Sequence, residues 1–129
     1  MSRESHIATG EKGEDRATRY LLSQGCAVIA RNWHAHPGEI DIVARCPYEG
    51  GGDVLAFVEV RTRHGRPGLA EESISPRKAA SMAAAAYAYM AAHELDPERT
   101  NWRIDLVTVA LDANVTTVNW IKGALPDTF

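Results

Sequence analysis

Cysteine is scarce in this chain, and no apolar stretch is long. Two cysteines, Cys26 and Cys46, are too few for a disulfide framework or a zinc knuckle, so we expect reduced, partly buried thiols in a cytoplasmic protein. The longest apolar run, residues 82–92, falls far short of the roughly 20 residues that a membrane span needs. Residues 1–10 are charged and polar, so we expect no signal peptide. These absences predict a soluble protein with no membrane partner.

An overall excess of positive charge is missing too. The 129 residues carry 14 Lys and Arg against 17 Asp and Glu, which gives a net charge of −3. That balance argues against a general basic protein that coats nucleic acid. Positive charge nevertheless gathers locally, because residues 61–80 hold five basic and two acidic side chains. This stretch is either a solvated loop or a contact surface for phosphates.

The length fits a single domain, residues 1–129, whose first nine residues we expect to form a flexible N-terminus. Apolar periodicity predicts a helix over 11–24, capped by Thr9, and another over 77–94, capped by Ser75 with Pro76 at its first position. Alternating and apolar runs predict strands at 27–33, 39–45, 54–62, 102–111 and 115–122. The order α-β-β-β-α-β-β predicts an α/β sandwich, in which helices flank one mixed sheet.

The second and third predicted strands form a hairpin that carries the most informative residues. A symmetric fold of the glycine-rich connection between them pairs residues whose numbers sum to 100. Asp41 then lies opposite Glu59, with Cβ atoms about 4.5–5.5 Å apart, and Glu39 lies opposite Arg61. The other face of the hairpin carries an apolar set suited to the core: Ile40, Ile42, Val58 and Val60.

Two opposed carboxylates repel each other unless a cation bridges them or solvent surrounds them. Asp41 and Glu59 are hard oxygen ligands and, with Glu14 arriving from the first helix, would suit Mg²⁺ or Mn²⁺. Alternatively, Arg61 and Arg63 pair with these acids as ordinary cross-strand salt bridges in a purely structural domain. Spacing and alternation leave both interpretations open.

The chain also contains Gly13-Glu14, Arg31-Asn32-Trp33, GEIDIVA at 38–44, FVEVR at 57–61, Lys78 and RIDLV at 103–107. In this order and spacing, the motifs resemble the YraN-like family of small, largely uncharacterised bacterial proteins. The resemblance spans residues 10–121 and implies a restriction-endonuclease-like fold, related to that of Holliday-junction resolvases. In that fold the active-site pattern is Asp, then Glu-x-Lys on the next strand, and the resolvases add a Glu from the first helix. The resemblance therefore implies Glu14, Asp41 and Glu59 as metal ligands. It also implies a nuclease-like protein that binds structured or branched DNA and, if it is an enzyme, cleaves it.

One position departs from that pattern. The run reads Glu59-Val60-Arg61, with arginine in place of the lysine. A guanidinium has a pKa above about 12 and stays protonated, so Arg61 can stabilise charge or orient water but is a poor general base. Lys78, at the start of the second helix, either supplies the missing ammonium or is a plain solvated residue. The alternative function is a catalytically weak or inactive module that binds nucleic acid or protein.

Several basic residues flank the acidic hairpin and are candidates for phosphate contacts. Because such contacts position a nucleic acid without reading its sequence, we expect selection of DNA structure rather than of sequence. Resolvase-like cleavage of two strands would need a homodimer. Arg103 and Asp105, two residues apart on one strand, predict a structural ion pair. The candidate DNA-binding residues are Arg63, His64, Arg66 and Arg77.

Overall fold

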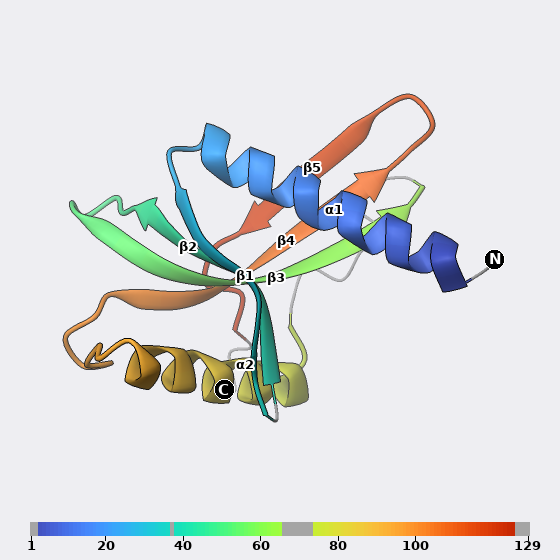
Figure 1. Ribbon diagram of the computed structural model, residues 1–129. Helices are drawn as coiled ribbons and strands as arrows, with labels where there is room; N and C mark the ends of the chain where they lie inside the picture. Colours follow the sequence, from blue (N-terminus) through green and yellow to red (C-terminus); the bar gives the residue numbers. More distant parts are fainter. Residues whose placement is uncertain (1–2, 37, 66–73, 126–129) are drawn as a thin grey trace.

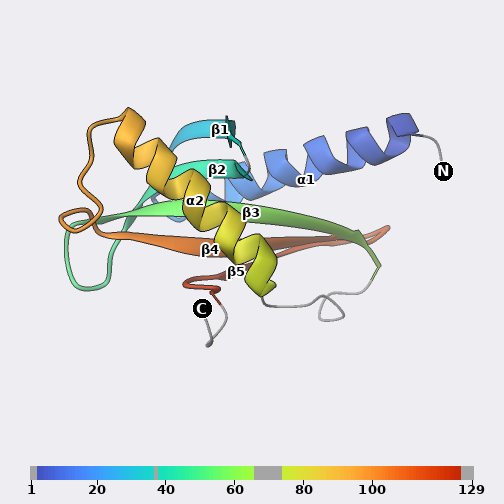
Figure 2. The ribbon, with the colours of Figure 1, turned by 90° about the horizontal axis from the view of Figure 1, so that it is seen from below.

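The computed structural model describes residues 3–36, 38–65 and 74–125. In this part of the chain, five strands form one sheet, with α1 on one face and α2 on the other (Figure 1, Figure 2). The order of elements is the predicted one. The elements are α1 (Arg3–Ser23), β1 (Ala27–Ala35), β2 (Gly38–Pro47), β3 (Asp53–His64), α2 (Pro76–Ala92), β4 (Trp102–Leu111) and β5 (Thr116–Ile121). None of the described helices is long and apolar enough to cross a membrane.

The sheet is mixed, as the sequence predicts. Its strand order is β1-β2-β3-β4-β5, and only β3 and β4 are parallel. Parallel neighbours need a crossover connection, which α2 supplies across one face of the sheet. In the β2–β3 hairpin, every pair from Ile42–Val58 to Pro47–Asp53 sums to 100, so the predicted register is confirmed.

Helix α1 begins earlier than predicted, whereas α2 begins where the sequence predicts. Helix α1 begins at Arg3, eight residues before its predicted start, so Thr9 lies inside the helix rather than at its N-cap. The apolar signal marks only the part that packs on the sheet, where Ala17 and Leu21 are fully buried. Helix α2 begins as predicted at Pro76, and the Ser75 hydroxyl accepts a hydrogen bond from the Lys78 backbone N–H at 3.2 Å.

The core has two layers, one on each face of the sheet. The α2 layer is close-packed because the helix presents alanines, and Trp33 and Trp102 pack at its margin as core residues rather than as exposed stacking platforms. Trp120 packs in the same way against the α1 layer. The largest buried side chains of the α2 layer are Ile40, Phe57, Ile74, Met82, Met90, Ile104 and Leu106.

The predicted apolar face of the hairpin is wrong at one residue. Ile42 and Val58 lie in the α1 layer with Val60 against them, but Ile40 lies in the α2 layer. Strand β2 therefore reverses its faces between Ile40 and Ile42, at Asp41. Beside this point β1 holds Asn32 in a left-handed conformation, with a φ of 52°. Simple alternation does not anticipate such a change.

Cys26 and Cys46 form a disulfide, so the expectation of two reduced thiols is wrong. The pairing of β1 with β2 explains the bond, since Ala27 pairs with Arg45 and the cysteines are the next residues outward. Their Cα atoms are 4.1 Å apart, near the roughly 4.5 Å of a close antiparallel pair. The sequence holds no local signal for this register, because the cysteines are 20 residues apart.

Candidate active site

Strands β2 and β3 stop pairing at the two acidic residues of the hairpin, Asp41 and Glu59. The β2–β3 ladder ends at Ile42 and Val58, and beyond it β2 continues beside β1 while β3 continues beside β4 (Figure 1). Asp41 and Glu59 are the first residues past the last pair. Their carboxylates therefore lie where the strands diverge, and we call this pair the acidic fork.

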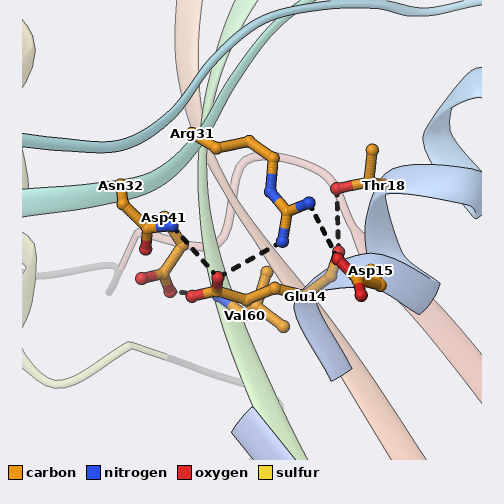
Figure 3. Close-up of polar contacts among 7 residues, drawn as sticks. All are labelled: Glu14, Asp15, Thr18, Arg31, Asn32, Asp41 and Val60. Carbon is orange, nitrogen blue, oxygen red and sulfur yellow. Dashed lines mark hydrogen bonds and ion pairs between the residues drawn. The ribbon is translucent and has the colours of Figure 1, made fainter. Parts of the chain in front are cut away.

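Asp41 is half-buried in the fork and has little compensation for its charge. Its Oδ2 accepts a hydrogen bond from the Val60 backbone N–H at 2.8 Å (Figure 3). Burial raises the pKa of Asp41 to about 7, and a hydrogen bond with Glu59 and the charges of Glu59 and Glu39 act in the same direction. The Val60 N–H lowers the pKa but does not offset these effects. Asp41 is therefore about half protonated near neutral pH.

Glu59 forms an ion pair with Lys78 of helix α2. Lys78 Nζ lies 3.3 Å from Glu59 Oε2, and the Glu59 side chain is only 13% exposed. Lys78 is in the first turn of α2, which the Ser75 cap fixes. The lysine is thus an ion-pair partner of the fork rather than a plain solvated residue. Its ammonium reaches Glu59, two residues before Arg61, which holds the lysine position of the family pattern.

Helix α1 brings a third carboxylate to the fork. A Cβ at Gly13 would overlap the Thr62 side chain of β3, so glycine allows the helix to approach the sheet closely. Glu14 follows, and its carboxylate points toward that of Asp41 (Figure 3). Glu14 Oε2 accepts hydrogen bonds from Asn32 Nδ2 at 3.3 Å and Arg31 Nη2 at 3.4 Å. These two β1 side chains hold Glu14 in place.

The donor chemistry of the fork fits a hard divalent cation. Carboxylate oxygens are preferred ligands of Mg²⁺ and Mn²⁺, and Mg²⁺ commonly takes one or two protein carboxylates with water completing its shell. Asp41 and Glu59 supply such a pair, and a bound cation would offset the burial and the neighbouring negative charges that together raise the pKa of Asp41. Within the described residues, no three His, Cys, Asp or Glu side chains lie close enough to hold an ion together. Glu14 as a third direct ligand stays a prediction.

An open groove adjoins the fork on the α2 side. It has a volume of about 440 Å³. A Cβ at Gly38 would overlap the Ser81 carbonyl oxygen, so this glycine brings β2 against α2. Sequence reasoning missed the groove, because only the pairing of distant segments assembles it. Its lining residues are His34, His36, Gly38, Glu39, Lys78 and Ser81.

Glu39 differs from its predicted arrangement. The β2–β3 ladder ends before the expected pairing with Arg61, and Glu39 instead pairs with His34 of β1. His34 Nδ1 lies 3.1 Å from Glu39 Oε2, with both side chains largely exposed. Glu39 thus belongs to the wall of the groove.

The predicted basic residues lie at two places near the fork. Arg61 and Arg63 are on β3 beyond Glu59, beside Thr108 and Ala110 of β4, and His64 is the last residue of that strand. Arg77 is exposed in the first turn of α2, next to Lys78. The remaining candidate, Arg66, lies outside the described residues.

Comparison with known proteins finds a family model that covers both residues of the fork. A model of the uncharacterised protein family UPF0102 matches residues 13–109, a range that includes Glu14, Asp41, Glu59 and Lys78. The chain belongs to this family. A UPF0102 protein of Roseiflexus castenholzii is 52% identical over 103 residues, covering 79% of this chain and 78% of the relative. One of Dehalococcoides mccartyi is 41% identical over 118 residues, covering 91% and 92%. The resemblance to the YraN-like proteins is confirmed, and the family's description names no activity.

Proposed function

We propose that this protein is a divalent-metal-dependent nuclease that acts on structured or branched DNA. The observation that carries the proposal is the acidic fork. Two carboxylates are held together and half-buried where the strands diverge, and the pKa of Asp41 is raised to about 7. Carboxyl groups with strongly raised pKa values in partly buried sites cluster at functional sites. The resemblance to the restriction-endonuclease-like fold supports the same chemistry.

Asp41 and Glu59 would hold Mg²⁺ or Mn²⁺, and Glu14 would be the third ligand. The bound ion would lower the pKa of its water and stabilise negative charge on the phosphate. Lys78 lies beside Glu59 and would place its ammonium against the scissile phosphate. Arg61 stays protonated and would stabilise charge rather than accept a proton.

The basic residues around the fork would hold the DNA backbone. We assign phosphate contacts to Arg63, His64, Arg66 and Arg77, which would position the DNA without selecting its sequence. The 440 Å³ groove with Lys78 on its wall would take the strand beside the fork. Cleavage of both strands of a branch would require a homodimer, with one fork for each strand.

A second candidate function is a binding module without efficient hydrolysis. One observation favours it, namely Arg61 at the position where the resembling pattern has lysine. The contact between Lys78 and Glu59 favours the enzyme, because it returns an ammonium to the fork. Both candidates bind DNA, so a cleavage assay separates them.

The test is a Mn²⁺ titration followed by NMR, combined with a cleavage assay on branched DNA. Paramagnetic Mn²⁺ at the fork should broaden the amide signals of residues 40–42 and 58–60 before others, and cleavage should require the metal. Asp41→Asn should lose both effects, and Asp53→Asn, at an exposed position at the other end of the hairpin, is the matched control that should keep them. Broadening that spares both segments would contradict the metal site. Broadening there without cleavage would favour the binding module.

A further inference from the structure

A second open groove lies between α1 and β5. It has a volume of about 390 Å³ and is lined by Arg16, Arg19, Tyr20, Thr116 and Val118. Strand β5 is at the edge of the described sheet, so the groove has one wall from a helix and one from an edge strand. None of the predicted DNA-binding residues lies in it.

Two guanidinium groups give this groove its charge. Arg16 and Arg19 are three residues apart, which makes them neighbours on one helix face. Among the described residues, neither forms an ion pair, whereas Arg31 and Arg103 contact acids at 2.8 Å. Two neighbouring guanidinium groups without an ion-pair partner among the described residues are available to an anion, and guanidinium geometry suits phosphate.

Polar and aromatic groups extend the groove along β5. Tyr20 and Thr116, whose side chains carry hydroxyl groups, are among its lining residues. The Tyr20 ring packs edge-on against Trp120, with ring centroids 6.4 Å apart. Lys122 Nζ, just after the end of β5, lies 4.4 Å from the centroid of the same Trp120 ring. The two guanidinium groups can each contact one phosphate of a nucleic-acid backbone.

The groove and the acidic fork lie on different sides of α1. Arg16 follows Glu14 by two residues, which is about 200° around a helix of 3.6 residues per turn. Glu14 contacts Arg31 and Asn32 of β1, whereas Arg16 lines a groove whose other wall is β5. A helix with its side chains is about 10–12 Å across, so a ligand reaching both sites must span roughly that width.

We propose that the α1–β5 groove binds a second phosphodiester of the nucleic acid whose scissile phosphate lies at the fork. The choice of nucleic acid rests on the proposed function, while the anion site itself rests on the groove. The two backbones of a duplex are separated by a major groove about 12 Å wide, similar to the width of α1. A duplex or a branch with paired arms can therefore contact both sites.

The test measures binding of a fluorescent four-way DNA junction by anisotropy, in EDTA and at several salt concentrations. Arg16→Ala/Arg19→Ala should reduce the log–log salt slope by about 1.8 and the affinity by roughly 60-fold at 0.1 M salt, if each arginine holds one phosphate. Arg45→Ala/Arg99→Ala removes two charges from exposed positions and is the matched control. Arg16→Lys/Arg19→Lys keeps the charge and should retain most of the slope. Equal slopes for the alanine pair and its control would overturn the proposal.

A second measurement distinguishes a DNA backbone from free phosphate and checks the fold. Inorganic phosphate should shift NMR signals of residues 16–20 and 116–118 only weakly, and the DNA junction should displace it. Phosphate binding at the groove with unchanged DNA affinity in the alanine pair would assign the site to a small anion and overturn the proposal. Should the alanine pair melt early, Arg16→Gln/Arg19→Gln repeats the test with longer side chains. Because no cleavage is measured, a failed nuclease assay leaves this result interpretable.

Discussion

Asp41 is half-buried and Asp105 is fully buried, and their carboxylates have different surroundings. Asp105 is fully buried, and its carboxylate accepts hydrogen bonds from Arg103 Nε at 2.8 and 3.1 Å, Trp120 Nε1 at 2.9 Å and the Gly123 N–H at 3.0 Å. Asp41 is only half-buried but accepts one backbone N–H and faces a second acid. Burial alone therefore does not indicate function. The two aspartates differ in how far hydrogen-bond donors and cations of the chain offset the negative charge of the carboxylate.

A buried carboxylate whose negative charge is offset by donors of its own chain is typical of a structural role. A carboxylate whose charge is not offset in this way indicates a site for a ligand. Every donor around Asp105 belongs to this chain, so nothing further is needed to neutralise it. Around Asp41, the raised pKa reports charge that the chain does not neutralise. The predictions below test this contrast, from the largest expected effect to the smallest.

Asp105→Asn should destabilise the protein by about 3–5 kcal/mol, because it leaves the Arg103 charge buried without its partner. Arg103 Nη2 is already buried without a hydrogen-bond partner among the described residues, so no other group is placed to replace Asp105. Urea denaturation at neutral pH measures the change. Asp53→Asn, at an exposed position, is the control. A loss below about 1 kcal/mol would remove the contrast between the two aspartates.

Glu59→Gln should reduce metal-dependent cleavage by at least about 100-fold, because it removes an anionic ligand while keeping the size of the side chain. In EDTA the variant should melt at or above the wild-type temperature, because relief of repulsion with Asp41 outweighs the loss of its partly exposed pair with Lys78. Metal-induced stabilisation should be lost as well. Glu49→Gln, at an exposed position at the far end of the hairpin, is the control.

The sign of the stability change in EDTA separates the two interpretations of Glu59. A purely structural salt bridge predicts that Glu59→Gln lowers stability by about 0–1 kcal/mol and that metal does not affect the wild type. Observing both would make the structural interpretation the better one.

The raised pKa of Asp41 predicts how stability in EDTA depends on pH. The pKa rises from 3.8 to about 7 on folding, so between these values the folded state binds more protons than the unfolded state. The contribution of Asp41 to stability is therefore present below about pH 4, decreases as the pH rises, and is lost above about pH 7. The slope from this group is at most about 1.4 kcal/mol per pH unit. Asp41→Asn should flatten it, and equal slopes in both proteins would show that Asp41 does not titrate in this range.

The contrast between the two aspartates also explains what the sequence could predict. Alternation and a symmetric loop were enough to bring Asp41 and Glu59 together, and the spacing of Arg103 and Asp105 predicted their ion pair, because both signals are local. The disulfide and the reversed face at Ile40 depend on how β1 pairs with β2. That pairing shifts register between Val28 and Ala30, and no local pattern encodes the shift. The 440 Å³ groove was missed for the same reason.

The smallest expected effect concerns a cation beside the fork. Arg103 is bound to Asp105 and is unavailable to DNA, whereas Arg77 is exposed next to Lys78. If the fork receives a phosphodiester, Arg77→Ala should reduce the log–log salt slope of DNA binding by about 0.9 and the affinity about 8-fold at 0.1 M salt. Thermal stability should not change, because an exposed charge contributes little to folding. Arg99→Ala, exposed and close to no fork residue in sequence, gives the reference slope. If Arg77→Ala binds DNA with that reference slope, the start of α2 is a solvated surface, and the phosphates approach the fork by another route.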